Sequence, residues 1–286
     1  DPKIAIMRAH WEAPFPSDRW CNPDDEWCWR IVLFSGLRDG GPAYFSLDIT
    51  DISTEFGHGG DNVKVRWEFT DPDDTADPFD PILGNSWSTP YVAEIWYQPE
   101  GEELDSRVVL VFGGGKDPNG DKGTPNMGSW LYIVNADNGD TLKVIPVPSI
   151  KQHCTISSGE LVNLSSYNDK CDKLDKNMNQ VPGDVKLIDI DNDGAPDWGY
   201  FGDLEGRVWK INIHNHDPEK WGICLFFDTG DKAYTNINPA LTGYIQAGCT
   251  CDLSEYGKKR PPACVDENLR RPILYRPEVT MAPSGE

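Results

Sequence analysis

The chain is built from short apolar runs separated by turn residues. Runs of four to ten residues that are rich in Val, Ile, Phe, Tyr and Trp are typical of β-strands. The 3.6-residue period of an amphipathic helix is rare along the chain. Glycine, at 27 residues, and proline, at 23, supply the turns between the runs. The pattern therefore predicts an all-β fold.

The predicted strands form a weak repeat. Each unit has an apolar strand that ends in glycine, then a strand with an early aromatic residue and a late Asp or Asn, and then a trailing strand. A leading strand precedes these in the second and third units. About four strands per unit are typical of a β-propeller blade. The predicted units cover 29–70, 88–147 and 184–228, and the leading strand of a further blade is predicted at 271–281.

The units recur at roughly 80–90 residues, a longer period than the ~40–45 of compact propeller repeats. Long insertions explain the difference. They are predicted at 56–61, 71–81, 116–127 and 154–180. A propeller closes with about 4–8 blades. We therefore expect residues 1–286 to form a segment of a larger propeller with long loop insertions.

The charge balance narrows the choice of partners. The chain has 47 acidic and 26 basic residues, with a formal net charge of −21. Nucleic acids and anionic membrane surfaces bind basic faces, so neither is expected as a partner. No apolar run approaches the ~18 residues that a membrane-spanning helix needs.

Eight cysteines in loop-rich surroundings favour disulfides and an oxidising compartment. Neither a Cys-x-x-Cys pair nor the spacing of a zinc site occurs. The local pairs Cys21–Cys28 and Cys154–Cys171 are the simplest pairing. The other four cysteines would then pair among themselves: Cys224, Cys249, Cys251 and Cys264. The sequence alone does not fix this connectivity.

A calcium loop is predicted between two strands of the third unit. Aspartates at positions 1, 3 and 5, followed by Gly194 at position 6, reproduce the first half of a known calcium-loop pattern. Position 12, where an EF-hand has a bidentate Glu, is Tyr200, so the loop is not an EF-hand. The predicted ligands are Asp189, Asp191, Asp193, the Ala195 carbonyl and Asp197. The alternative is a solvated acidic turn without a cation.

Two other motifs contain metal-binding residue types. Asp117, Asn119 and Asp121 have the one–three–five spacing of a second calcium loop, but an ordinary Asx turn fits their glycine positions better. His214 and His216 alternate at a strand end, without a third ligand nearby in sequence. For these two histidines we favour a solvent-exposed turn.

Several motifs, taken in order, resemble the PilC/PilY family of type IV pilus tip-associated proteins. They lie at 43–51, 88–92, 111–117, 131–139, 183–209 and 271–277. The resemblance implies a calcium-binding C-terminal propeller of the modified quinoprotein type. It also implies a place at the cell surface or pilus tip, with pilins or minor pilins, and host or surface ligands, as partners. The expected roles are pilus assembly, control of extension and retraction, attachment and motility.

Two other functions are compatible with an acidic, tryptophan-rich propeller. A pyrroloquinoline-quinone dehydrogenase also binds calcium, although the adjacent cysteines common at its cofactor are not found here. A ligand-binding propeller of the integrin type has calcium loops that recur from blade to blade, whereas this chain has one strong loop. No Ser/His/Asp or Cys/His set stands in a catalytic context, so we do not expect an enzyme.

Overall fold

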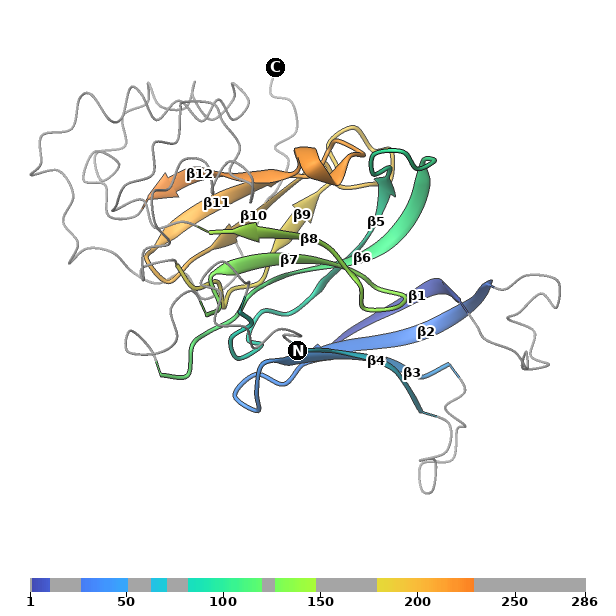
Figure 1. Ribbon diagram of the computed structural model, residues 1–286, viewed down its shortest axis with the longest axis horizontal. Helices are drawn as coiled ribbons and strands as arrows, with labels where there is room; N and C mark the ends of the chain where they lie inside the picture. Colours follow the sequence, from blue (N-terminus) through green and yellow to red (C-terminus); the bar gives the residue numbers. More distant parts are fainter. Residues whose placement is uncertain are drawn as a thin grey trace, which may run out of the picture.

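The computed structural model describes residues 2–10, 27–50, 63–70, 82–119, 127–147 and 179–228. Within these residues, twelve β-strands form three four-stranded antiparallel sheets, and one short 3-10 helix, η2 (Pro218–Lys220), precedes the last strand (Figure 1). The prediction of an all-β fold is confirmed. In the same residues no helix has the length and hydropathy to cross a membrane.

Each sheet is a meander, because every strand pairs with its neighbour in sequence. The first sheet contains β1 (Lys3–His10), β2 (Trp27–Gly36), β3 (Ala43–Asp48) and β4 (Lys64–Thr70). The second contains β5 (Tyr91–Tyr97), β6 (Asp105–Gly113), β7 (Trp130–Asn135) and β8 (Thr141–Pro146). The third contains β9 (Lys186–Ile188), β10 (Trp198–Gly202), β11 (Arg207–Asn212) and β12 (Gly222–Asp228). Successive four-stranded meanders are the blades of a propeller.

The first strand, β1, is the one strand among those described that the sequence pattern does not predict. Met7 and Ala9 are buried, but Ile4 and Ile6 on the opposite face are 61% and 71% exposed. Because both faces are apolar, the segment lacks the apolar–polar alternation of a half-buried strand. The strand predicted at 271–281 lies outside the described residues, as do the insertions predicted at 56–61 and 71–81.

The first and second sheets are joined by aromatic side chains. Tyr44 packs on Phe112 with ring centroids 4.1 Å apart, and Phe69 meets Tyr132 edge-on at 5.6 Å. Trp67 also donates its indole N–H to the carbonyl of Ala136, at 3.0 Å. Burial of such large rings supplies most of the free energy that holds two sheets together.

The strand β6 ends in a glycine because another segment of the backbone comes very close at this point. A Cβ on Gly113 would lie 2.2 Å from the carbonyl oxygen of Val181, so no side chain fits there. The Gly113 N–H donates to Ser88 Oγ at 2.9 Å. The segments that lead into the second and third sheets therefore both contact this point, as strand-end glycines allow.

The corner after the third strand has the same geometry in all three sheets. Asp48, Asn135 and Asn212 each accept a hydrogen bond from the backbone N–H two residues further on, at 2.9, 2.9 and 3.2 Å. This is an Asx turn, which explains the late Asp or Asn of each repeat. In the third sheet it fixes the backbone of His214.

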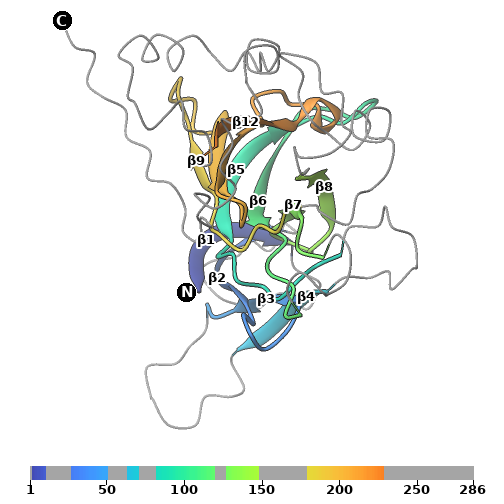
Figure 2. The same cartoon turned by 90° about the vertical axis from the view of Figure 1, so that its left-hand side faces the viewer.

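The second and third sheets also meet where the η2 helix lies beside the turn between β5 and β6 (Figures 1 and 2). Tyr97 and Trp221 lie with ring centroids 6.1 Å apart, and Lys143 pairs with Glu219 at 2.8 Å. The backbone N–H of Gln98 donates to the carbonyl of His216, also at 2.8 Å. The second sheet therefore lies between the first and the third and contacts both.

Candidate metal centre

The predicted acidic loop, residues 189–197, joins β9 to β10. The Asp197 N–H donates to the Ile188 carbonyl at 2.9 Å and closes the loop at its base. The backbone turns sharply at two positions with positive φ, 60° at Asn192 and 96° at Gly194. Glycine and asparagine adopt this left-handed conformation more easily than other residues.

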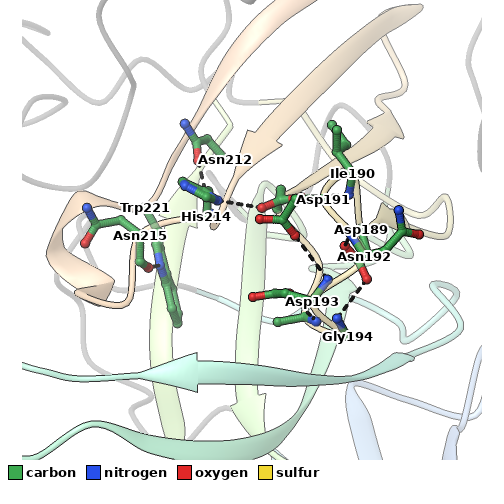
Figure 3. A network of polar contacts seen from close by, with 12 residues as sticks. Asp189, Ile190, Asp191, Asn192, Asp193, Gly194, Asn212, His214, Asn215 and Trp221 are labelled. Carbon is green, nitrogen blue, oxygen red and sulfur yellow. Dashed lines mark hydrogen bonds and ion pairs between the residues drawn. The ribbon is translucent and has the colours of Figure 1, made fainter.

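The aspartates of the loop shape it through hydrogen bonds to its own backbone (Figure 3). Asp189 accepts from the N–H groups of Asn192 and Gly194, at 2.7 and 3.0 Å. Asp191 Oδ1 accepts from the N–H of Asp193 at 3.2 Å. Asp193 Oδ1 accepts from the N–H of Ala195 at 2.8 Å. Short Asp side chains at alternating positions can make these bonds, which fold the loop back on itself.

Asp197 is the buried member of the loop, with 7% of its surface exposed. Its Oδ2 accepts from the N–H of Ile190 at 2.7 Å, and its Oδ1 lies 2.5 Å from Nδ1 of His214. Burial alone would raise the pKa of Asp197, but the Ile190 N–H and the His214 contact outweigh it and lower the pKa. Asp197 is therefore ionised at neutral pH.

Three of the carboxylates come together. One oxygen from each of Asp189, Asp191 and Asp197 lies within 4.8 Å of the others, a group that could hold a metal ion. Asp193 is not part of this group of side chains, and its Oδ1 accepts from the N–H of Ala195 instead. The carbonyl of Ala195 stays a predicted ligand. A set made only of carboxylate oxygens suits a hard cation rather than a soft one.

His214 is the residue that the sequence pattern misses at this site. It lies 17 residues after Asp197, in a turn that is exposed as expected, yet its ring contacts the buried carboxylate. The pairing of Trp198 with Asn212 brings the two segments together, and the N–H of Ile213 donates to the Asp197 carbonyl at 2.9 Å. The register of β10 and β11 would have revealed this contact.

The residues that follow β10 stabilise the turn into β11. Asp203 is fully buried in the turn between β10 and β11 and accepts from the N–H of Arg207 at 2.9 Å and from the indole of Trp209 at 2.8 Å. Burial raises the pKa of Asp203 to about 6, although the nearby Arg207 and Trp209 act in the opposite direction. This network anchors the turn.

At the second predicted loop, the structure shows an Asx turn. Asp117 is buried and its Oδ1 accepts from the N–H of Asn119 at 2.7 Å. Asp121 lies outside the described residues.

Of the cysteines, Cys224 is buried in β12. The side chains of all its predicted partners, and of both local pairs, lie outside the described residues, so the disulfides remain predictions.

The fold and the loop define a propeller segment with a cluster of three carboxylates in the acidic loop of its third described blade. No family model matches the chain. The type IV pilus biogenesis factor PilY1 homolog of Xylella fastidiosa is 26% identical over 218 residues, which are 76% of this chain and 12% of that protein. PilY1 of Pseudomonas aeruginosa is 26% identical over 260 residues, 90% of this chain and 17% of that protein.

The chain is thus similar in sequence to the PilY1 proteins over most of its length, and the predicted resemblance to the PilC/PilY family is confirmed. It spans less than a fifth of the length of these curated relatives. Among solved structures, the crystal structure of the Pseudomonas aeruginosa PilY1 C-terminal domain is similar. The match has a TM-score of 0.49 and 20% identity, and covers 81% of this chain and 38% of that one.

Proposed function

We propose that this chain is a calcium-binding propeller segment of a type IV pilus-associated protein and that it catalyses no reaction. In this proposal it supports pilus assembly, the balance of extension and retraction, surface attachment and motility. The observation that carries the calcium site is the convergence of Asp189, Asp191 and Asp197 within 4.8 Å.

The donor set favours calcium over other cations. Calcium accepts 6–8 oxygen ligands in flexible geometry, whereas magnesium demands a near-ideal octahedron and zinc prefers nitrogen and sulfur. The three clustered carboxylates provide oxygens, and Asp193 and the carbonyl of Ala195 are close in sequence for further coordination. Bound calcium would supply the positive charge that offsets their mutual repulsion.

Calcium in this loop would stabilise the hairpin of β9 and β10. Only three residues of β9 pair with β10, so the hairpin has few hydrogen bonds of its own. The acidic loop connects the two strands, and a calcium ion bound by residues from both ends of the loop would hold those ends together. Ligands that bind only the folded state raise its stability.

The proposed place at the cell surface rests on the relatives, which are named as type IV pilus biogenesis factors. Pilins or minor pilins are the proposed partners, and export through an oxidising compartment fits the eight cysteines. An Asp191→Ala substitution in the source organism is expected to reduce the number of surface pili. An unchanged pilus number, with the protein present at its normal level, would contradict the pilus role of the loop.

Calorimetric titration of the chelator-treated chain with calcium tests the site itself. We expect one site that Asp191→Ala weakens strongly, because that carboxylate belongs to the cluster. The melting temperature should rise with calcium in the unmutated chain and much less in the variant. Equal melting temperatures with calcium and with chelator would rule out the calcium site.

A further inference from the structure

The turn formed by residues 212–217 lies between the acidic loop and the second sheet. On one side it contacts Asp197, and on the other it contacts the loop that follows β5. Figure 3 shows His214 extending towards the acidic loop, with Asn215 and Trp221 on the other side of the turn. The turn is thus a short covalent connection between the candidate metal centre and a contact between sheets.

The position of His214 is set by polar contacts rather than by packing. Its side chain is 66% exposed, so burial contributes little to its orientation. Its backbone N–H donates to Asn212 Oδ1, at 3.2 Å, and its Nδ1 lies 2.5 Å from Asp197 Oδ1. A shift of the Asp197 carboxylate would therefore move the ring of His214 or break its contact.

The other end of the turn supports the contact with the second sheet. The His216 carbonyl accepts from the N–H of Gln98 at 2.8 Å, and the Asn215 carbonyl accepts from the indole N–H of Trp221. Trp221 is fully buried and its ring faces Tyr97 at 6.1 Å between centroids. Two adjacent carbonyls of the turn thus accept hydrogen bonds at this contact between sheets.

We infer that His214 is a positioning residue that transmits the calcium state of the acidic loop to the contact between the second and third sheets. This inference rests on the calcium site proposed above. Partners that hold a metal ligand from outside orient that ligand and tune the affinity. By linkage, a contact that favours the calcium-bound loop is itself strengthened when calcium binds.

A simpler role for His214 would be local stabilisation of the turn, independent of calcium. The two roles differ in one measurable quantity, the calcium-dependent change in the protection of the Gln98 N–H from hydrogen exchange. Transmission predicts that calcium slows this exchange. A purely local role predicts the same rate with calcium and with chelator.

The experiment is amide hydrogen exchange at Gln98, followed by NMR on the whole chain, with saturating calcium and with chelator. The variants are His214→Ala, which removes the contact, and His214→Asn, whose Nδ2 can replace Nδ1 as a donor. Lys143→Met is the matched control, because it breaks the pair with Glu219 between the same sheets without touching the turn. Calorimetry on each variant confirms that the calcium sites are saturated.

In the unmutated chain we expect calcium to slow the Gln98 exchange by about tenfold, and His214→Ala to weaken calcium binding by about tenfold. At saturation, His214→Ala should show no calcium effect at Gln98, while His214→Asn and Lys143→Met should retain it. Absence of calcium binding in the unmutated chain would overturn the calcium site itself. Calcium binding with an unchanged Gln98 rate, or an undiminished calcium effect in His214→Ala, would overturn this inference alone.

Discussion

The second and third sheets both join their first two strands through an acidic loop, at 98–104 and 189–197 respectively. The first of these contains Glu100, Glu102 and Glu103, so it is as rich in carboxylates as a metal loop. Yet of the two loops, only the one at 189–197 brings three carboxylates within 4.8 Å of one another. Acidic composition is therefore not what distinguishes the two loops.

In the second sheet the acidic side chains lie near a cation of the protein. Arg107 lies 3.8 Å from Glu102 and 3.7 Å from Asp105, and its guanidinium stacks on Tyr97 at 4.5 Å. The loop itself turns through a backbone bond from the Glu102 N–H to the Pro99 carbonyl, at 3.1 Å. These carboxylates neither shape the backbone nor converge.

The difference lies in side-chain length and position. An aspartate is short enough to accept from the N–H two or three residues ahead, so alternating aspartates fold the loop around themselves. The longer glutamate side chains do not make such bonds, and the loop of the second sheet is turned instead by the backbone hydrogen bond between Glu102 and Pro99. The third sheet also buries one carboxylate, Asp197, at the base of its loop, which the loop of the second sheet does not do.

The largest effect should follow from removing the buried carboxylate. Asp197→Asn is expected to weaken calcium binding by at least about 100-fold, because it removes a charged ligand held by two partners. With chelator present, it should also lower the free energy of unfolding by about 1–2 kcal/mol, since a charge-assisted hydrogen bond becomes a neutral one.

The matched change in the other loop is Glu102→Gln, measured by the same calorimetry and urea unfolding. It should leave calcium binding unchanged and alter stability by less than about 1 kcal/mol, because an exposed ion pair contributes little. A comparable loss of calcium affinity in Glu102→Gln would show that overall charge, not loop geometry, determines binding.

A smaller and more selective effect is expected at the glycines of the two loops. Gly101 and Gly194 have φ values of 85° and 96°, and a Cβ on either would meet no atom within 4 Å. Alanine at each position should therefore cost about 1–2 kcal/mol of stability through backbone strain alone. Only Gly194→Ala should also weaken calcium binding, by about tenfold. Equal calcium affinities in the two variants would show that the bend at Gly194 does not shape the site.

The smallest effect concerns pH. The pKa of Asp197 is lower in the folded chain than in the unfolded chain, where it lies near 3.9, because the Ile190 N–H and His214 stabilise the carboxylate. Its contribution to stability is thus complete above the unfolded pKa and is lost as pH falls through the folded pKa. In chelator, the unmutated chain should lose more stability than Asp197→Asn between pH 5 and 3, by urea unfolding. Equal losses of stability in the two proteins over this pH range would contradict the lowered pKa of Asp197.

Local sequence patterns could predict the acidic loop and all the described strands except β1, because these depend on neighbouring residues. Alternating aspartates and a glycine define the loop within nine residues, and apolar runs ending in glycine define the strands. His214 could not be predicted in this way, since it meets Asp197 only through the register of β10 and β11. Asp193 has the correct spacing, but it lies outside the cluster and its Oδ1 accepts from the N–H of Ala195, a geometry that spacing does not reveal.

Every strand of the three sheets pairs with a strand that adjoins it in the sequence. Local pairings of this kind require little loop-closure entropy, so each sheet can form early, without waiting for distant parts of the chain. Docking of the sheets through Tyr44, Phe112 and Trp221 joins segments that lie further apart and is the slower step. During synthesis, the blades can therefore fold in the order in which they emerge, and the apolar face of each blade is covered when the next one forms.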